Sequence, residues 1–264
     1  MHARHAYQSG LDIGVSCLSM AAVPLWMLGY PDRAATQSEQ AIDLAQQLKH
    51  PFSLAFALIN AARLYHFRRE WRAVQARAEA VQALATEHDF ALWRAVATRW
   101  RGVALAAQGQ VEEGIDLIHQ GQAAYQATGT ATGESYYRLL LAEAYCHAGQ
   151  IERGLDVMRE ALTTFAHAED RLYEVEVYRL KGKLLLTRKS PPLSEVEACF
   201  RQALAVARRQ KAKSLELRAA MSLAQLRPQH ENDVALGDIY HGFTEGLGTA
   251  DLEEVKARLE ARRI

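Results

Sequence analysis

One residue pair could serve as part of a phosphate-binding loop, in which Gly-x-x-x-x-Gly-Lys is followed by Ser or Thr. The only Gly-Lys pair in the chain is Gly182-Lys183, but Leu184 follows it and Val177 stands where the first glycine is needed. We therefore interpret Gly182 as a position where two helices pack closely, and we expect no nucleotide or cofactor site. The sequence also lacks the HExxH, Gly-x-Ser-x-Gly and Gly-x-Gly-x-x-Gly motifs of common hydrolases and dinucleotide-binding enzymes.

Histidine and cysteine side chains could instead hold a metal ion, where their spacing allows several ligands to meet. His2 and His5 have such a spacing, but no further ligand lies beside them at this end of the sequence. Cys17, Cys146 and Cys199 are isolated and form no CxxC pair, so we expect buried thiols in the reducing cytoplasm. The sequence therefore predicts neither a metal centre nor catalytic residues, and the protein is not expected to be an enzyme.

Charge is balanced over the chain, which has 31 Lys and Arg residues against 31 Asp and Glu residues. This balance gives no overall attraction to nucleic acid or to an anionic membrane, so neither is expected as a partner. The most basic stretch comprises Arg201, Arg208, Arg209, Lys211, Lys213 and Arg218. It could contact an acidic partner or nucleic acid, but we favour a solvated helix face whose cations form inter-helix pairs with Glu197 and Glu216.

Residues 13–31 carry no charged side chain and could in principle span a membrane. The stretch approaches the roughly 20 residues that a spanning helix requires. Small and polar residues such as Gly14, Ser16 and Pro24 interrupt it, and Asp12 lies directly before it. We therefore predict a buried helix here and no membrane association.

The elements that would position any site are helices, because alanine, leucine, glutamine, glutamate and arginine dominate the sequence. Residue types recur at steps of 40. A column of small residues comprises Ala22, Ala62, Gly102, Ala142 and Gly182, and a large apolar column follows at Leu25, Tyr65, Leu105, Tyr145 and Leu185. A turn column comprises Gly29, Arg69, Gly109 and Gly149, and two compact columns comprise Ala34, Val74, Gly114 and Gly154, then Ala41, Val81, Gly121 and Ala161. An insertion of two residues near Lys189–Pro192 shifts the next compact positions to Val196 and Ala203.

Such columns are typical of antiparallel helix pairs, which need small side chains where their backbones approach most closely. Each unit is therefore predicted to be a helical hairpin. A single hairpin cannot bury both of its faces, so the hairpins should stack into one all-α solenoid over residues 1–264. The predicted units are residues 12–50, 51–89, 90–130, 131–170, 171–211 and a degenerate capping unit at 212–264.

Local signals refine this prediction at the C-terminal end. Ser194–Glu197 and Asp251–Glu254 each resemble a capping box at the start of a helix. In the last unit we predict a helix over Lys213–Leu226, an irregular segment over Arg227–Asp233 and a short helix over residues 234–241. A loop over Gly242–Thr249 and a closing helix that runs to Ile264 should complete the chain.

The columns resemble the tetratricopeptide repeat, which has small, large, small and small residues at its positions 8, 11, 20 and 27. Leu28–Ala34 and Ala148–Gly154 resemble the turn of that family into its second helix. The resemblance implies a right-handed superhelix of antiparallel helix pairs. The usual unit of the family is shorter than the period of this chain, which implies longer helices here.

Longer segments resemble one group in particular, the C-terminal repeat region of large bacterial signalling proteins. These proteins join a class III adenylate or guanylate cyclase domain, or another output domain, to an AAA-type ATPase and then to the repeats. The segments are Tyr30–Ala34, His50–Ala57, Ala85–His88, Tyr178–Leu186, Ala198–Leu204, Ala212–Ala220 and Phe243–Gly246. The resemblance implies that the chain is the repeat arm of such a protein, or a separated piece of one. Arg227–Asp233 and Gly242 depart from the group's pattern, and the cyclase and ATPase parts are not in this sequence.

The tetratricopeptide resemblance also implies a binding groove, because the first helix of each unit lines the concave face in that family. Transferring this geometry by register gives Arg63, His66, Arg99, Glu143, His147, Arg179 and Lys183. Cations prevail in this set, so an acidic peptide, or an acidic surface of an ATPase or cyclase domain of the same system, is the expected partner. Alternatively, these are ordinary residues that face solvent.

The sequence thus predicts a non-catalytic interaction or regulatory scaffold in the cytoplasm. A second hypothesis is an arm that senses a small molecule and shifts the nucleotide switch of an ATPase-type transcriptional regulator.

Overall fold

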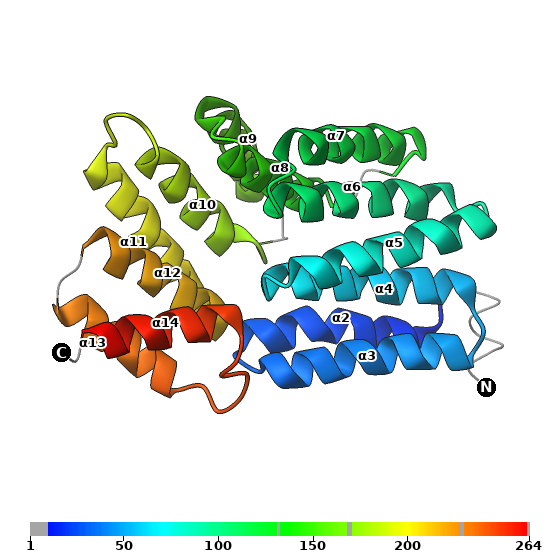
Figure 1. Cartoon of the computed structure of the whole chain (residues 1–264), viewed down its shortest axis with the longest axis horizontal. Coiled ribbons are helices and arrows are strands. Elements are labelled where there is room, and N and C mark those ends of the chain that lie inside the picture. Colours follow the sequence, from blue (N-terminus) through cyan, green and yellow to red (C-terminus); the bar gives the residue numbers. More distant parts are fainter. Residues whose placement is uncertain (1–9, 131–132, 168–170, 228–229, 263–264) are drawn as a thin grey trace. The chain divides into compact units, whose positions relative to one another are not determined.

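The computed structural model describes residues 10–130, 133–167, 171–227 and 230–262 (Figure 1). Over these ranges the chain forms thirteen α-helices and no β-strand, so the all-helical prediction is confirmed. The helices are α2 (Ile13–Met27), α3 (Pro31–Gln47), α4 (Pro51–Phe67), α5 (Trp71–Glu87), α6 (Ala91–Ala107), α7 (Val111–Ala127), α8 (Glu134–His147), α9 (Ile151–His167), α10 (Glu174–Leu186), α11 (Leu193–Gln210), α12 (Lys213–Leu226), α13 (His230–His241) and α14 (Ala250–Ala261).

The starts of the odd-numbered helices reproduce the period of the sequence. Helices α3, α5, α7 and α9 begin at Pro31, Trp71, Val111 and Ile151, and each start lies one full period after the one before. Helix α11 begins at Leu193, slightly later than the period alone would place it, as the predicted insertion requires. The structure therefore confirms a helical repeat of this length, with two helices in each unit.

Eight of the turns share one backbone conformation, in which a residue just after the helix adopts a positive φ. At the predicted turn column these residues are Gly29, Arg69, Gly109 and Gly149, and between successive units they are Lys49, Asp89, Gly129 and Lys211. The next backbone N–H then donates to a carbonyl five residues earlier, as from Glu70 to Tyr65 at 2.9 Å and from Gln110 to Leu105 at 3.0 Å. This left-handed cap satisfies carbonyls at the helix end and turns the chain into the next helix.

The small columns mark close helix packing, as predicted. A Cβ atom on Gly102 of α6 would lie 2.5 Å from the carbonyl oxygen of Gly114 on α7, too close for any side chain. A Cβ atom on Gly182 would likewise lie 2.5 Å from the ring of Phe200 on α11. Gly182 therefore serves helix packing, which confirms the interpretation of the Gly-Lys pair.

The chain divides into two compact units, and each is described by itself. Unit 1 comprises residues 1–26 and 30–132, and unit 2 comprises residues 27–29 and 133–264. In unit 1, each helix from α3 to α7 contacts the next, and α4 also contacts α6. In unit 2, the four helices α8, α10, α12 and α14 form a row in which each contacts the next, while α9, α11 and α13 pack beside them. We call these four helices the even row of unit 2. The single solenoid over residues 1–264 stays a prediction.

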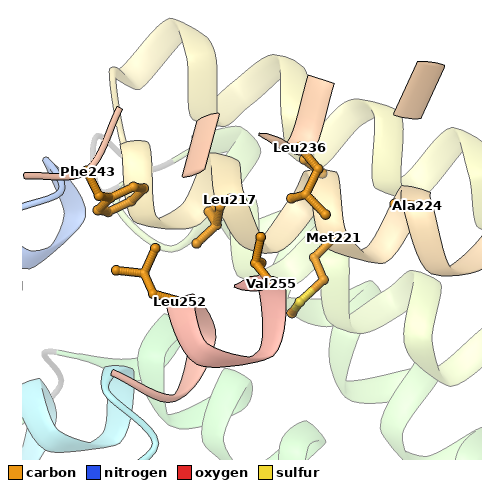
Figure 2. Close-up of a cluster of buried hydrophobic side chains, with 8 residues drawn as sticks. Leu217, Met221, Ala224, Leu236, Phe243, Leu252 and Val255 are labelled. Carbon is orange, nitrogen blue, oxygen red and sulfur yellow. The ribbon is translucent and has the colours of Figure 1, made fainter. Parts of the chain in front are cut away.

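The C-terminal end of unit 2 has its own apolar core, shown in Figure 2. Helix α12 contributes Leu217, Ala220, Met221 and Ala224, helix α13 contributes Leu236, and Phe243, Leu252 and Val255 complete the cluster. Burial of these side chains is the main force that holds α13 and α14 against α12.

The structure confirms three predicted features of this end and corrects others. Helix α12 has the predicted bounds, a loop follows α13, and α14 closes the described chain. Helix α13 begins at His230, inside the segment predicted to be irregular. Residues 228–229 of that segment lie outside the described residues.

Both predicted capping boxes are wrong. Helix α11 begins at Leu193, directly after Pro192, so Ser194 already lies inside the helix, and the cap makes no side-chain hydrogen bond. Proline is compatible with helix starts because its missing N–H costs nothing there. At α14 the residue before the helix is Thr249, whose hydroxyl donates to the carbonyl of Gly246 at 2.8 Å instead of capping the helix.

The uncharged segment near the N-terminal end forms α2 and the turn into α3. Among the helices of the described ranges, none combines the length and the hydropathy that a membrane crossing requires.

Candidate functional site

The seven predicted groove residues lie in both units. Arg63 and His66 are on α4 and Arg99 is on α6, all in unit 1. The remaining four are on the even row of unit 2, Glu143 and His147 on α8 and Arg179 and Lys183 on α10. Each unit therefore presents a separate set.

In unit 1, His66 belongs to an aromatic cluster. It is 6% exposed, and its ring lies 5.5 Å from the ring centroids of Phe67 and Trp71 and 5.7 Å from that of Trp100. The edge-to-face angles are those that aromatic pairs prefer. His66 therefore contributes to packing, while Arg63 on the same helix is half-buried.

Arg99 is directed toward the second helix of its own hairpin. Its Nη1 donates to Oε1 of Gln122 at 2.9 Å, and its guanidinium lies 4.3 Å from the ring centroid of Tyr125. Both partners are on α7 and both are buried. A cation that stacks on an aromatic face in this way stabilises the hairpin.

In unit 2, Arg179 forms a buried ion pair with Glu176, one helical turn earlier on α10. Nε donates to Oε1 at 2.8 Å and Nη2 donates to Oε2 at 2.5 Å, a two-pronged geometry that suits a guanidinium and a carboxylate. The two side chains are only 10% and 8% exposed. Arg179 is therefore held rigidly, and its charge is already neutralised inside the protein.

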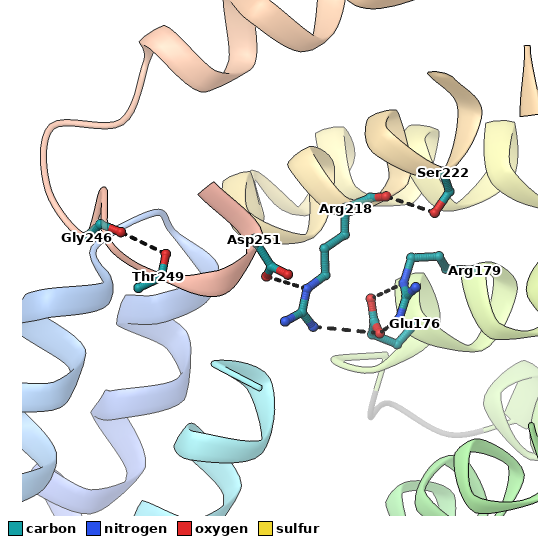
Figure 3. Close-up of polar contacts among 7 residues, drawn as sticks. All are labelled: Glu176, Arg179, Arg218, Ser222, Gly246, Thr249 and Asp251. Atoms are coloured by element: carbon teal, nitrogen blue, oxygen red, sulfur yellow. Dashed lines mark hydrogen bonds and ion pairs between the residues drawn. The ribbon is translucent and has the colours of Figure 1, made fainter. Parts of the chain in front are cut away.

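The pair extends into a network along the even row, shown in Figure 3. Arg218 of α12 places Nη1 3.9 Å from Oε2 of Glu176, and its Nε donates to Oδ2 of Asp251 on α14 at 2.7 Å. Arg218 and Asp251 are also buried. Two guanidinium groups and two carboxylates thus alternate across α10, α12 and α14, and their formal charges cancel. We call these four residues the ionic network.

The network fixes the protonation of its members. Burial alone raises the pKa of Glu176, but the positive charges of Arg179 and Arg218 outweigh it and lower the pKa to about 2. Burial lowers the pKa of Arg179, and the carboxylate of Glu176 reverses this and raises it above its usual value. Charged side chains become this deeply buried only when they are paired, as these are.

Lys183 lies one helical turn beyond Arg179 and, unlike the ionic network, is exposed. Although much of the Lys183 side chain is exposed, its amine has lost part of its surrounding water. The charge of Arg179, followed by this desolvation, lowers the pKa of Lys183 to about 8, while Glu176 and Glu143 act in the opposite direction. The half-buried Glu143 and the exposed His147 lie on the neighbouring helix α8. Lys183 is therefore a cation at neutral pH and loses its charge in mildly alkaline solution.

Sequence reasoning missed Glu176 and Asp251 and misplaced Arg218, which it assigned to a solvated basic face. Arg208 of that stretch pairs with Glu216 of α12 at 2.8 Å, as predicted, whereas Arg201 pairs with Glu197 at 2.8 Å within α11 and not between helices. The spacing of Glu176 and Arg179, three positions apart on one helix, was the available signal for the ion pair.

In the described ranges, no cluster of three or more His, Cys, Asp or Glu side chains could hold a metal ion. His2 and His5 lie outside the described residues. Cys146 is half-buried, and burial raises the pKa of its thiol, so it is not an activated nucleophile.

Comparison with known proteins gives no further guide, because no protein-family model matches the chain and no curated protein matches it.

Proposed function

We propose that the chain is a non-catalytic interaction arm that captures an acidic partner on the even row of unit 2. The observation that carries this proposal is the ionic network with Lys183 at its exposed end. Arg179 and Arg218 are neutralised by Glu176 and Asp251, so Lys183 is the cation that an acidic side chain would meet. The rigid network holds α10 against α12 and α14, and this gives the partner a preorganised surface.

The wider setting of the proposal is a tetratricopeptide-like right-handed superhelix in the bacterial cytoplasm. The regular recurrence of helix pairs and the helix contacts along the even row support this architecture. In this setting the arm belongs to a signalling system with an ATPase or a class III cyclase, and the acidic partner is a peptide or a domain of that system.

The test is binding of short fluorescein-labelled peptides to the full chain, measured by fluorescence anisotropy. Acidic peptides rich in Asp and Glu should bind, and peptides with Asn and Gln in their place should not. Lys183→Glu should weaken binding of the acidic peptides by at least roughly fivefold, because the change replaces attraction with repulsion. Lys189→Glu is the matched control, since Lys189 is an exposed lysine of the same unit. Equal binding by both variants and the parent chain would exclude the site.

A second candidate function uses the same cation. The carboxylate or phosphate of a small metabolite could also meet Lys183, which would make the chain the ligand-sensing arm of an ATPase-type regulator. A thermal-shift screen of acidic metabolites distinguishes the two functions. A metabolite that raises the melting temperature of the parent chain but not of Lys183→Glu, in the absence of peptide binding, favours the sensing arm.

A further inference from the structure

Unit 1 contains an open cleft of about 530 Å³ that is formed by α5 and α6. Its lining comprises side chains of both charges, an amide, a hydroxyl and a methyl group. The lining residues are Glu79, Gln82, Ala83, Thr86 and Glu87 of α5 and Arg101 of α6. Polar groups that converge on one concave surface are typical of sites for small molecules. The cleft has no residue in common with the interaction site on α10.

The cation of this cleft is not neutralised by the protein. Arg101 is half-buried, yet it forms no ion pair with any residue in the described ranges. The polar residues one heptad away on the same stripe of α6 do have partners. Arg94 pairs with Asp89 at 3.4 Å, and Gln108 donates to Gln75 at 2.8 Å. Arg101 is therefore available to a ligand carboxylate, which a guanidinium binds through two parallel hydrogen bonds.

Unit 2 shows how the fold uses a cation at this repeat position when it neutralises it. Lys181 lies two full periods after Arg101, and its Nζ is 3.0 Å from Oε1 of Glu195 on α11. The counterpart of Glu195, allowing for the insertion of two residues, is Glu113 on α7. Glu113 is exposed, and in the described structure no ion pair joins it to Arg101. Arg101 lines the cleft with residues of α5 instead.

The carboxylates of the cleft are arranged along one face of α5. Glu79, Ala83 and Glu87 are four positions apart, so they share that face, with an exposed methyl group between two carboxylates. Eight residues of helix separate the carboxylates by about 12 Å. Oε1 of Glu79 accepts a hydrogen bond from Gln75 at 2.9 Å, and Oε1 of Glu87 lies 3.9 Å from Nε2 of His88. No lysine or arginine within the described ranges pairs with either carboxylate.

The position of Arg101 along the cleft follows from the contact between the two helices. Oγ1 of Thr98 lies 3.5 Å from Oε1 of Gln82. Because α5 and α6 run in opposite directions, Arg101 lies beside the residues about one turn before Gln82, at the level of Glu79. One end of the cleft therefore has a guanidinium and a carboxylate, and the other end has the carboxylate of Glu87.

We propose that this cleft binds a free basic amino acid such as lysine. Its α-carboxylate pairs with Arg101, and its α-ammonium group pairs with Glu79 at the same end. The side-chain ammonium group pairs with Glu87, and the methylene chain lies over Ala83. With a charge-assisted hydrogen bond of about 2.8 Å at each end, an extended lysine spans the separation of the two carboxylates. The net positive ligand also complements a lining in which carboxylates outnumber the cation.

The test is isothermal titration calorimetry of L-lysine into the full chain, in which we expect saturable binding. Ala83→Arg should abolish it, because the added guanidinium occupies the cleft and pairs with the carboxylates. Ala83 is exposed, so this variant should fold like the parent chain. Glu112→Gln is the matched control and should bind lysine normally, since Glu112 is an exposed carboxylate on α7 of the same unit.

Three analogues, each without one charged group, assign the contacts. Lysinamide lacks the carboxylate, Nα-acetyl-lysine lacks the α-ammonium group, and norleucine lacks the side-chain ammonium group. Each should bind the parent chain about tenfold more weakly than lysine, because one charge-assisted hydrogen bond is lost. The difference from lysine should disappear in the variant without the matching partner. These variants are Arg101→Met for lysinamide, Glu79→Gln for Nα-acetyl-lysine and Glu87→Gln for norleucine.

Several results would overturn this inference. Lysine that does not bind at millimolar concentration would do so, as would equal affinity of the parent chain, Glu79→Gln, Glu87→Gln and Arg101→Met. Equal binding of lysine and Nα-acetyl-lysine by the parent chain would exclude a free amino acid, because the acetylated form has the chemistry of a peptide C-terminus. Failure of acidic peptides to bind near Lys183 would leave this cleft unaffected, since its probe is a cationic small molecule.

Discussion

The two units place an arginine at the same position of the repeat and use it differently. Arg99 of α6 and Arg179 of α10 are separated by two full periods, so they occupy equivalent positions. Arg99 bonds to the neutral Gln122 and stacks on Tyr125, whereas Arg179 forms a buried ion pair with Glu176. The residue three positions earlier decides the difference, because it is Val96 in unit 1 and Glu176 in unit 2. The repeat register thus predicts where a side chain is placed, and the residues around it determine whether it stacks on a ring or forms an ion pair.

The largest expected effect comes from removing the guanidinium in each unit. Arg179→Met should lower the free energy of unfolding by about 3–5 kcal/mol, because it leaves the carboxylate of Glu176 buried with a weakened partner. Arg99→Met should cost only about 1 kcal/mol, since its main partners are a neutral amide and a ring. Urea unfolding followed by circular dichroism measures both values. Equal losses would contradict the distinction between the units.

The next effect comes from giving α10 of unit 2 the apolar residue that unit 1 has at the equivalent position, Val96. Glu176→Val combined with Arg179→Met should recover most of the stability lost by Arg179→Met alone, because a well-packed apolar pair can replace a buried ion pair. A double-mutant cycle in urea unfolding gives the coupling energy of the two positions. A double variant that is no more stable than Arg179→Met would contradict this prediction.

The pH dependence of stability should also come from unit 2. The folded-state pKa of Glu176 is lowered to about 2 from an ordinary value of 4.5, so its contribution is complete above pH 4.5 and disappears as the pH falls toward 2. The shift corresponds to a stability change on the order of 3 kcal/mol. Hydrogen exchange of the α10 amides between pH 5 and pH 2.5, compared with those of α6, would detect it. The double variant at positions 176 and 179 should lose this dependence.

Binding at Lys183 should depend on pH in the alkaline range. Because the pKa of Lys183 is lowered to about 8, the amine is charged at pH 7 and mostly neutral at pH 9. We expect the affinity for acidic peptides to fall roughly fivefold between these values, since the ion pair is lost. Lys183→Arg should keep its affinity at pH 9, because a guanidinium stays charged. Anisotropy titrations at the two pH values provide the measurement.

The smallest effects concern the turns, which both units share. Lys49 adopts a positive φ of 50°, so Lys49→Gly should stabilise unit 1 by about 1 kcal/mol. Gly109→Ala is the reverse test at a φ of 95°, and it should destabilise the unit by about the same amount although there is space for the added Cβ. Opposite signs in thermal unfolding would confirm that the left-handed cap is common to glycine and non-glycine turns.

Much of the fold was predictable because it repeats. Each column of small residues samples the same helix contact several times, so Gly102, Gly114 and Gly182 could be assigned to packing without a structure. The ends of the helices were less predictable, because two local signals can propose different starts for the same helix. Near α11 the sequence offers both the capping box Ser194–Glu197 and Pro192, and the helix begins directly after Pro192. The same holds at α13, where a segment of polar residues begins a helix that α12 and α14 stabilise by packing.

The candidate site was predictable only in part. Register identified Arg179 and Lys183 as neighbours on one face of α10, since residues four apart share a helix face. It could not identify Asp251 as the partner of Arg218, because the two residues are 33 positions apart and their approach depends on how α14 packs against α12. Long-range pairing of this kind depends on tertiary packing, which local spacing does not encode.

The most direct measurement of the central claim is a map of the surface that an acidic peptide protects in the full chain. Hydrogen–deuterium exchange of the free and peptide-bound chain should show slower exchange on α8 and α10, around Glu143, His147 and Lys183, and no change on α4 and α6 of unit 1. Protection confined to unit 1, or to the odd-numbered helices of unit 2, would contradict the assignment of the binding face to the even row.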